Sequence, residues 1–268
     1  MKARAEIGVL GGSGFYRLFS EARSLRMKTR YGVPSGPVTV ADVAGRPVAF
    51  LPRHGLQHEY PPHVVPYRAN MDAFRQLGVT RVIGPCAVGS LKAEVRPGDL
   101  VFCDQFVNFT SGRKDTFYDG PRTTHVSTAN PYCPEMREAG IEAAKRMGAR
   151  ARESGTVVVV QGPRFSTAAE SRFFGSQGWD VINMTQYPEV ALARELGFCY
   201  LNISLVTDYD AGLEGDPSVK PVSQKDVVKV FNRNIQKLRA LVLELAKTLP
   251  EKKGCDCSHS LDHARVAA

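Results

Sequence analysis

The chain has 268 residues, with 35 lysines and arginines against 27 aspartates and glutamates, which gives a formal net charge of +8 at pH 7. This length suits one large domain with a well-buried core, and no shift in composition marks a linker. The basic residues are spread along the sequence and are not grouped with aromatic residues, so we expect no nucleic-acid partner.

The N-terminus passes from the short charged stretch MKARAE directly into an apolar run, without the apolar core of a signal peptide. No segment has the roughly 18 consecutive apolar residues of a membrane-spanning helix. Of the six cysteines, Cys86, Cys103 and Cys199 lie in or beside apolar runs, which is typical of reduced core thiols. We therefore expect a cytoplasmic protein without a membrane partner.

Predicted strands and helices alternate along the chain. Apolar, β-branched runs indicate strands at Ile7 to Leu10, Val38 to Val43, Val48 to Leu51, Val82 to Val88, Leu100 to Val107, Thr156 to Val160, Val181 to Met184 and Leu201 to Val206. Helical periodicity falls at Tyr67 to Leu77, Pro134 to Met147, Thr167 to Gly175, Pro188 to Leu196 and Gln224 to Leu249. Several strand runs are continuously apolar, as in strands covered on both faces. The pattern predicts a single α/β domain over 1–250, with a mixed central β-sheet flanked by helices.

The first glycine cluster, GVLGGSGFY, follows the first predicted strand. A dinucleotide-binding motif would need a third glycine at Arg17, and the next residues do not begin a helix. A glycine turn also lets backbone N–H groups approach an anion, and the hydroxyl of Ser13 can add a hydrogen bond. A phosphate cradle and a plain tight turn explain the cluster about equally well.

A second cluster, LPRHGLQHEYPPHVVPYRAN, is rich in proline, arginine and histidine. Arg53 has a planar fork that matches phosphate oxygens, and His54 can add a donor, so the pair predicts an oxyanion site. The histidine spacing does not fit a helical zinc motif, and no carboxylate cluster accompanies it. We expect no metal here, and we interpret His58 and His63 as ordinary loop residues.

Two later stretches, NMTQYPE at 183–189 and VTDYD at 206–210, together describe a pocket for a nucleoside. The first supplies polar groups for a sugar and an anion. The second places Asp208 and Asp210 just past a predicted strand, where open α/β sheets bind their ligands. Carboxylates in this position are expected to take part in chemistry.

Long motifs occur in order over nearly the whole chain. They are IGVLGGSGFY, PRHG, HEYPPHVVPYRAN, VGSL, PGDLVFCDQFV, YDG, QGPRFSTAAES, NMTQYPE and VTDYDAG. This series resembles the trimeric purine nucleoside phosphorylases, and specifically their 5′-methylthioadenosine phosphorylase branch. The resemblance implies a homotrimer or a dimer of trimers. It also implies phosphorolysis of S-methyl-5′-thioadenosine to adenine and 5-methylthioribose 1-phosphate, with inorganic phosphate as co-substrate and no metal or other cofactor.

The resemblance further implies roles for individual residues. Phosphate would be held by Ser13, Arg53, His54, Cys86, Ala87 and Thr185. The ribose would rest against Met184, with Asn183 placing the strand end. Without the resemblance, Met184 and Phe165 would be interpreted as core residues, and Thr185 or Ser166 as helix caps.

At the base, the resemblance implies that Phe165 stacks on the purine while Asp208 and Asp210 address N7 and the 6-substituent. Asp208 would donate the proton, which requires a raised carboxyl pKa from a closed pocket and the neighbouring carboxylate. Asp208 also favours a 6-aminopurine, since the oxopurine enzymes tend to have asparagine or another residue at this position. Ser166 is a further candidate for specificity.

The group that meets the 5′ end of the nucleoside is left open between Val222 and Gln224. A methylthio group needs an apolar wall, whereas a hydroxyl needs a hydrogen-bond partner. His125 would reach a neighbouring subunit's pocket near this end. Adenosine and 6-oxopurine nucleosides (inosine, guanosine, methylthioinosine) are therefore alternative substrates. A hydrolytic nucleosidase and a non-catalytic nucleotide-binding module are lesser alternatives.

The last segment, 251–268, holds Cys255, Cys257, His259 and His263 and has few apolar residues. Two thiols one residue apart would close a strained ring, and the composition is poor in groups that could form a core. We expect a mobile appendage, with redox-sensitive pairing of the thiols as the next interpretation and metal binding as the last.

Overall fold

The computed structural model describes residues 4–121, 123–212, 219, 221–262 and 264–265, without the side chains of 224 and 226. Within this part, eleven strands form one sheet in the order β2-β3-β4-β1-β5-β10-β9-β7, and β5 also pairs with β11, which is followed by β6 and β8. The strands are β1 Ile7–Gly11, β2 Arg23–Leu25, β3 Val38–Val43, β4 Arg46–Pro52, β5 Arg81–Ser90, β6 Leu100–Val101, β7 Gln105–Phe109, β8 Ala151–Arg152, β9 Thr156–Val160, β10 Val181–Asn183 and β11 Cys199–Asp208.

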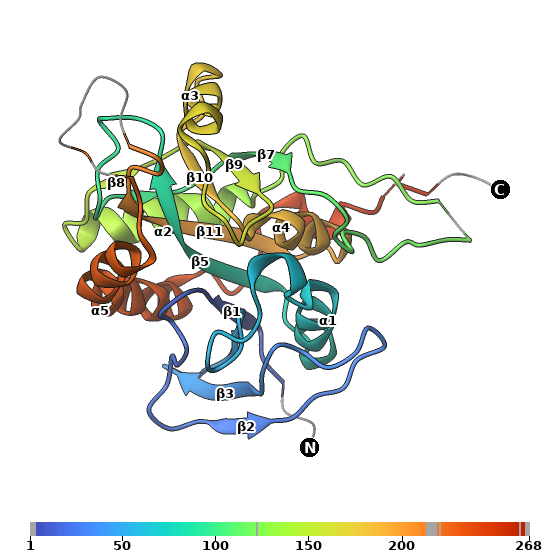
Figure 1. Ribbon diagram of the computed structural model, residues 1–268. Helices are drawn as coiled ribbons and strands as arrows, with labels where there is room; N and C mark the ends of the chain where they lie inside the picture. Colours follow the sequence, from blue (N-terminus) through green and yellow to red (C-terminus); the bar gives the residue numbers. More distant parts are fainter. Residues whose placement is uncertain (1–3, 122, 213–218, 220, 263, 266–268) are drawn as a thin grey trace.

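Helices cover both faces of the central strands (Figure 1). They are α1 Tyr67–Leu77, α2 Pro134–Arg146, α3 Ala168–Ser176, α4 Gln186–Glu195 and α5 Gln224–Thr248, with short 3₁₀ helices η1 Pro62–Val64 and η2 Asp256–His259. Along β1, Val9 packs in a core cluster with residues of α2 and α5, and its neighbour Leu10 packs in another with residues of α1 and α4. This alternation follows from the period of two in a strand, and it confirms the predicted mixed sheet flanked by helices.

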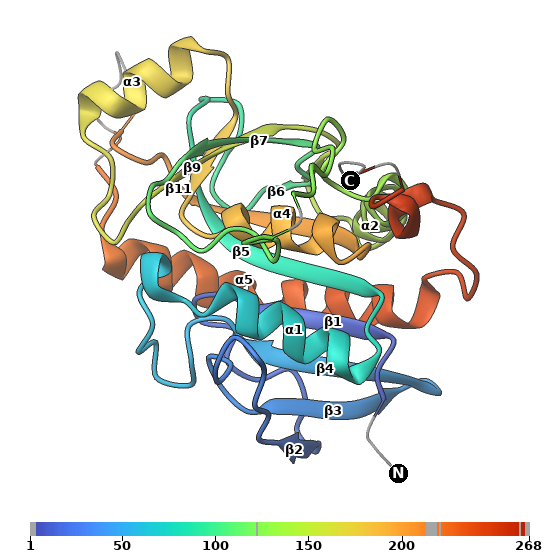
Figure 2. The ribbon, with the colours of Figure 1, turned by 90° about the vertical axis from the view of Figure 1, so that its right-hand side faces the viewer.

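Strands β1, β4, β5 and β11 run parallel to one another, so their carboxyl ends meet at one edge of the sheet. Strand β10 is parallel to β9 but antiparallel to β5, and it brings the NMTQYPE stretch to the same region. Helix α3 lies at the end of the molecule opposite to β2 in both ribbon views (Figures 1 and 2). The sheet thus gathers distant sequence motifs around one edge.

The strand expected at Leu100 to Val107 is divided in the structure. The chain pairs first with β11 and β8 as β6, and then with β9 as β7, so it changes partners between Val101 and Gln105. Hydrophobicity predicted one strand here because Phe102 and Cys103, which follow β6, are apolar. In the structure both are fully buried although neither belongs to a strand. The short strands β2 and β8 were not predicted, since two or three residues carry too little periodicity.

The C-terminal segment differs from the expected mobile appendage. Arg81 Nη2 donates to the Glu251 carbonyl at 3.5 Å, the Gly254 N–H donates to Glu135, and Cys257 is 4% exposed. Composition could not show these contacts, because the partners are contributed by β5 and α2. His263 lies outside the described residues. In the described part of the chain, no helix is both long enough and apolar enough to cross a membrane.

Candidate active site

A cavity of about 470 Å³ opens at the carboxyl ends of the parallel strands. It has an end rich in hydrogen-bond donors, formed by residues after β1 and β4, and an end with two carboxyl groups, formed after β11. The predicted site residues that line it are Ser13, Arg53, His54, Cys86, Ala87, Phe165, Ser166, Asn183, Met184, Thr185, Asp208 and Asp210. Segments separated by up to about two hundred residues in the sequence thus form one pocket.

The glycine turn after β1 lies against the middle of β5. A Cβ atom added to Gly12 would come within 2.9 Å of Arg53 Nη1 and 3.0 Å of the Pro85 carbonyl oxygen. Only glycine fits this contact without displacing a neighbour. The turn therefore serves to bring the backbone of Gly12 and Ser13 close to the Arg53 guanidinium at the cavity wall.

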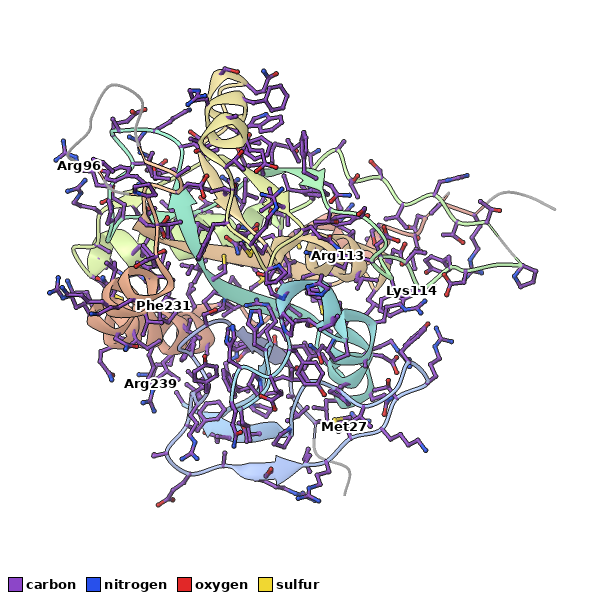
Figure 3. All side chains as sticks on the ribbon, in the orientation of Figure 1. Met27, Arg96, Arg113, Lys114, Phe231 and Arg239 are labelled. Atoms are coloured by element: carbon purple, nitrogen blue, oxygen red, sulfur yellow. The ribbon has the colours of Figure 1, made fainter. Side chains whose placement is uncertain are left out.

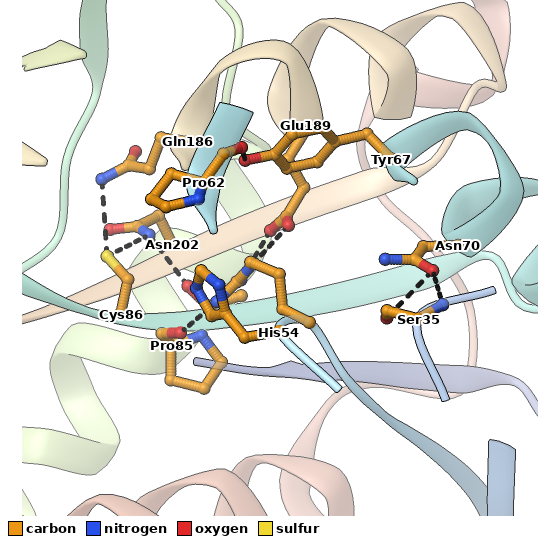
Figure 4. A network of polar contacts seen from close by, with 12 residues as sticks. Ser35, His54, Pro62, Tyr67, Asn70, Pro85, Cys86, Gln186, Glu189 and Asn202 are labelled. Atoms are coloured by element: carbon orange, nitrogen blue, oxygen red, sulfur yellow. Dashed lines mark hydrogen bonds and ion pairs between the residues drawn. The ribbon is translucent and has the colours of Figure 1, made fainter. Parts of the chain in front are cut away.

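Arg53 is 1% exposed and forms a two-pronged ion pair with Glu189, its Nε and Nη2 donating at 2.6 and 2.8 Å (Figure 4). Nη1 donates to the Pro85 carbonyl at 3.1 Å, and the Tyr200 hydroxyl donates to the same Glu189 carboxylate at 2.6 Å. Burial alone would lower the pKa of Arg53, but Glu189 raises it overall. The sequence did not single out Glu189, although it closes the NMTQYPE motif, and it is what holds the guanidinium in place.

His54 is buried beside Arg53, and its Nδ1 lies 2.8 Å from the Tyr60 carbonyl oxygen. Burial, together with repulsion from Arg53, lowers the pKa of His54 to about 3. The ring is therefore neutral, and because a carbonyl can only accept, Nδ1 carries the proton and Nε2 is an acceptor. The sequence predicts that His54 adds a hydrogen-bond donor to an oxyanion site, whereas its Nε2 is an acceptor in the structure.

His58 was interpreted as an ordinary loop residue but lines the cavity. It stacks on His54 with ring centroids 4.5 Å apart, and its Nδ1 lies 3.0 Å from the Tyr16 hydroxyl. Burial lowers the pKa of His58 as well. Its backbone φ of 60° is in the left-handed region, and no sequence pattern predicted this conformation.

The middle of the cavity is formed where β10 gives way to α4. Asn183 ends the strand, Met184 follows, and Thr185 occupies the N-cap position of α4 without a side-chain capping bond. The Asn183 amide donates to Cys86 Sγ at 3.4 Å, while its Oδ1 is buried and has no partner among the described residues. Thr185 thus lies at the site without the helix-capping bond that was its ordinary alternative.

Arg113, which Figure 3 labels, lies in the loop after β7 and holds this junction together. Its guanidinium donates to the carbonyls of Met184 at 3.0 Å, Tyr187 at 2.5 Å and Gln161 at 2.9 Å. It thereby ties the ends of β9 and β10 together. Burial lowers the pKa of Arg113. Sequence analysis missed this residue, because a single arginine in a polar loop carries no periodic signal.

At the other end, a register shift in the pairing of β11 with β5 falls between Val206 and Asp208. Such bulges re-aim the side chain that follows them. Asp208 accepts hydrogen bonds from the Thr207 hydroxyl at 2.6 Å and from the Asp210 N–H at 2.8 Å. A Cβ added to Gly89 would lie 2.9 Å from Asp208 Oδ1 and 3.1 Å from Asp210 Cβ, so the glycine makes room for both carboxyl groups.

Asp210 is the more deeply buried of the two carboxyl groups, at 3% exposure. Burial raises the pKa of Asp210, and the nearby hydroxyl of Ser171 offsets part of that rise. Asp210 Oδ2 and Ser166 Oγ are both buried without a hydrogen-bond partner among the described residues. The raised carboxyl pKa that the sequence predicts for Asp208 stays a prediction.

Phe165 and Ser166 precede α3 and are held by its N-terminus. Thr167 is the N-cap and forms a capping box with Glu170, whose carboxylate also pairs with Arg164 through two bonds of 2.7 Å. Ser166 is therefore not the helix cap, the ordinary role that its sequence context suggested. The Arg164 hydrogen bond lowers the pKa of Glu170 to about 2.

The structure does not bring every predicted residue to the cavity. Val222 bonds through its N–H to the Asp210 carbonyl but does not line the cavity, and the side chain of Gln224 lies outside the described part. Val227, from the first turn of α5, does line the cavity. His125 is exposed in a distant loop, with its N–H bonded to the Ala264 carbonyl at 2.7 Å.

Known proteins resemble this chain over nearly its whole length. Residues 6–247 match the family model described as the phosphorylase superfamily. The S-methyl-5′-thioadenosine phosphorylase of Pyrococcus furiosus is 50% identical over 256 residues, which cover 96% of this chain and 97% of that protein. A purine nucleoside phosphorylase of Streptomyces coelicolor is 47% identical over 270 residues, with coverage of 97% and 95%.

A solved structure of methylthioadenosine phosphorylase from Schistosoma mansoni in complex with adenine has a TM-score of 0.91 to this chain. The two sequences are 31% identical, and the match covers 98% of this chain and 99% of that one. The likeness extends over the whole sheet and its helices. The chain belongs to the phosphorylase superfamily, as its sequence motifs indicate.

Proposed function

We propose that this protein catalyses the phosphorolysis of S-methyl-5′-thioadenosine to adenine and 5-methylthioribose 1-phosphate. The observation that supports this most is the division of one cavity into an end with a charged guanidinium and an end with two carboxyl groups. Relatives that are about 50% identical to this chain are named S-methyl-5′-thioadenosine phosphorylase. Purine and methionine salvage are the processes that such a reaction serves.

Phosphate is assigned to the end formed by Ser13, Arg53, His54, Thr185 and the chain at 86–87. The guanidinium keeps N–H groups beyond those that bond Glu189 and Pro85, and the Ser13 and Thr185 hydroxyls can add donors. Neutral His54 can accept the proton of a monohydrogen phosphate through Nε2. This set would orient the phosphate oxygen for attack on C1′ of the sugar.

During the reaction, the C1′–N9 bond breaks and a phosphate oxygen forms the new bond to C1′. The sugar carries positive charge in the transition state, which the bound phosphate stabilises, and Met184 forms the apolar surface beneath it. The electron pair of the broken bond stays on adenine. A proton delivered to N7 relieves that charge, and general acid catalysis of this kind contributes about 10² to 10⁴ in rate.

We assign the contact with N7 to Asp208 and that with the 6-amino group to Asp210. The Asp208 and Asp210 side chains both lie close to Gly89, so one purine bound there can contact both carboxyl groups. Asp210 Oδ2 and Ser166 Oγ lack partners among the described residues and face the same cavity, as groups that await a ligand would. Phe165 supplies the stacking surface for the purine.

The wall contributed by α5 supports a methylthio group at the 5′ position. Val227 is 8% exposed and apolar, whereas a 5′ hydroxyl would need a buried hydrogen-bond partner. Because one relative is named a purine nucleoside phosphorylase, adenosine and 6-oxopurine nucleosides are the second candidate substrates of this protein. The reaction itself would be unchanged in that case.

We further propose that the protein works as a homotrimer or a dimer of trimers in the cytoplasm. His125 is exposed and does not line the cavity of its own chain. Leu56 and Val64, near the cavity in sequence and space, are 47% and 51% exposed, which suits a surface covered by another copy. Beyond phosphate, the proposed reaction requires no cofactor.

The experiment that tests this function measures free base released from methylthioadenosine, adenosine and inosine, each with and without phosphate. We expect release that depends on phosphate and is most efficient with methylthioadenosine. Release that needs no phosphate would show a hydrolase, and no release from any of the three would show a binding protein. A preference for inosine would replace the proposed substrate while leaving the phosphorylase reaction.

A further inference from the structure

Four cysteine side chains meet at one point on the side of the molecule away from the cavity. This cysteine cluster consists of Cys133, Cys199, Cys255 and Cys257. Cys133 comes from the N-cap of α2, Cys199 from the first residue of β11, and the other two from the C-terminal segment. No sequence pattern joins Cys133 and Cys199 to the two C-terminal cysteines, because more than fifty residues lie between Cys199 and Cys255.

The distances within the cluster fit a metal ion better than disulfides. All four Sγ atoms lie within 4.8 Å of one another, and Cys255 Sγ is 3.6 Å from Cys133 Sγ and 3.4 Å from Cys199 Sγ. Sulfurs at the corners of a tetrahedron with zinc–sulfur bonds of about 2.3 Å are roughly 3.8 Å apart. A disulfide would instead bring two of them to about 2.0 Å.

The surroundings suit the negative charge that four thiolates and one divalent ion would carry. The Cys133 sulfur accepts the Met136 N–H at 3.5 Å, at the positive end of the α2 dipole. The Arg194 guanidinium acts electrostatically on Cys257, and its Nε is buried without a partner among the described residues. Three of the four sulfurs belong to buried residues, as in closed structural sites.

Backbone contacts place the C-terminal thiols independently of any bond between sulfurs. The Ser260 hydroxyl donates to the Arg194 carbonyl at 2.6 Å, and the Gly254 N–H donates to Glu135 on α2. Cys255 is extended and caps η2, so the chain turns before Cys257 and both thiols face the same point. This turn compensates for a spacing shorter than that of most zinc motifs.

We propose that the cysteine cluster binds one zinc ion, which fastens the C-terminal segment to α2 and β11. Each zinc–sulfur bond would form as a thiol gives its proton to solvent, so binding releases protons and weakens at low pH. Tetrahedral sulfur ligands select zinc over calcium and magnesium, which prefer oxygen. The proposed site is structural and does not depend on the proposed function.

The test is the zinc content of the full chain produced with zinc in the medium and purified with reductant. We expect about one zinc ion per chain, as for a closed four-cysteine site. The double variant C255S/C257S should fall to background. The matched control is Cys103→Ser, which removes a buried thiol outside the cluster and should keep its zinc.

Measurements on the unaltered protein guard against a variant that fails to fold. Removing zinc with a chelator should lower the melting temperature and speed proteolysis of the C-terminal segment, and added zinc should restore both. Cobalt added in place of zinc should give the visible absorption of a tetrahedral tetrathiolate site. Unfolding without reductant should release six reactive thiols.

The proposal is overturned if the purified chain holds only traces of zinc and cobalt gives no such spectrum. Loss of reactive thiols in the unfolded chain would then identify the cluster as a pair of disulfides. A zinc content equal in the double variant and the parent protein would also overturn it, because the metal would be bound elsewhere.

Discussion

At the scale of single residues, the base end of the cavity carries the proposed choice of substrate. We expect Asp208→Asn to lose most activity on 6-amino nucleosides while keeping or gaining relative activity on inosine. Asparagine cannot donate a carboxyl proton to N7, but its amide can donate to O6 and its carbonyl can accept from N1–H of an oxopurine. Steady-state constants for methylthioadenosine, adenosine and inosine test this.

Tyr209→Phe is the matched control for that change, because its hydroxyl points away to the Ala93 carbonyl at 3.4 Å. It should leave the ratio of inosine to adenosine efficiency at the parent value. If Asp208→Asn also leaves this ratio unchanged, or lowers it, Asp208 does not read the purine edge.

We expect the Asp210 carboxyl group to lower the stability of the protein at neutral pH although activity requires it. Its pKa is raised in the folded state, so its favourable contribution is present below the unfolded pKa of about 3.9 and is lost as pH rises through the folded pKa. Asp210→Asn removes the buried charge and tolerates the φ of 46° at this position. The variant should therefore lose activity but unfold at a higher temperature than the parent protein at neutral pH.

Melting temperatures of Asp210→Asn and the parent protein, compared over a pH series from the unfolded pKa of about 3.9 up to neutral pH, check this sign. The advantage of the variant should grow with pH. An advantage that is constant, or that shrinks as pH rises, would show that burial does not hold a proton on Asp210.

The residues that line the cavity could be predicted from the sequence only where they belong to a recognisable motif. Ser13, Arg53 and Asp208 stand in long matched strings, and they line the cavity. His58 and Arg113 do not follow a period or a spacing, and their positions depend on loop contacts formed by distant segments. Which ring nitrogen of His54 carries the proton depends on the Tyr60 carbonyl, which the sequence does not place.

At the scale of elements, the junction of β9, β10 and α4 depends on Arg113. We expect Arg113→Ala to lose about 2 to 4 kcal/mol of unfolding free energy, because several buried carbonyls lose their donor. The Michaelis constant for the nucleoside should rise more than that for phosphate, since Met184 is the residue released. Lys114→Ala, at the exposed neighbour, should change neither.

Thermal unfolding and two-substrate kinetics of both variants decide the point. If Arg113→Ala is as stable and as active as Lys114→Ala, the guanidinium does not position the junction.

Elements with strong periodicity were predicted closely, and those defined by pairing were not. The bounds expected for α1 are the observed ones, because its apolar stripe ends at Gly78, which adopts a left-handed φ of 84°. The division between β6 and β7 is invisible to hydrophobicity, since the connecting residues are buried too. Which strand a segment pairs with is decided by contacts far away in the sequence.

At the scale of the whole molecule, His125 provides the test of assembly. If it completes a neighbour's pocket, oligomers that combine His125→Ala chains with Asp208→Asn chains contain repaired sites. Such a site has Asp208 from one chain and His125 from the next. Activity per intact Asp208 should then rise above that of the His125→Ala oligomer and approach that of the parent protein.

Coexpressed chains with different tags, purified through both, give these mixed oligomers. Mixing the two purified homo-oligomers without exchange is the control and should give no gain. No gain in the mixed oligomers, or a fully active monomer in sedimentation, would contradict the assembly that we propose.

The central claim is that phosphate attacks the sugar, and labelled phosphate tests it most directly. Methylthioadenosine is incubated with the protein and phosphate labelled with ¹⁸O at every oxygen, and the sugar product is analysed by mass spectrometry. The account predicts a methylthioribose phosphate that retains all the labelled oxygens, including the one bonded to C1′. Free methylthioribose, with adenine released at the same rate without phosphate, would contradict it.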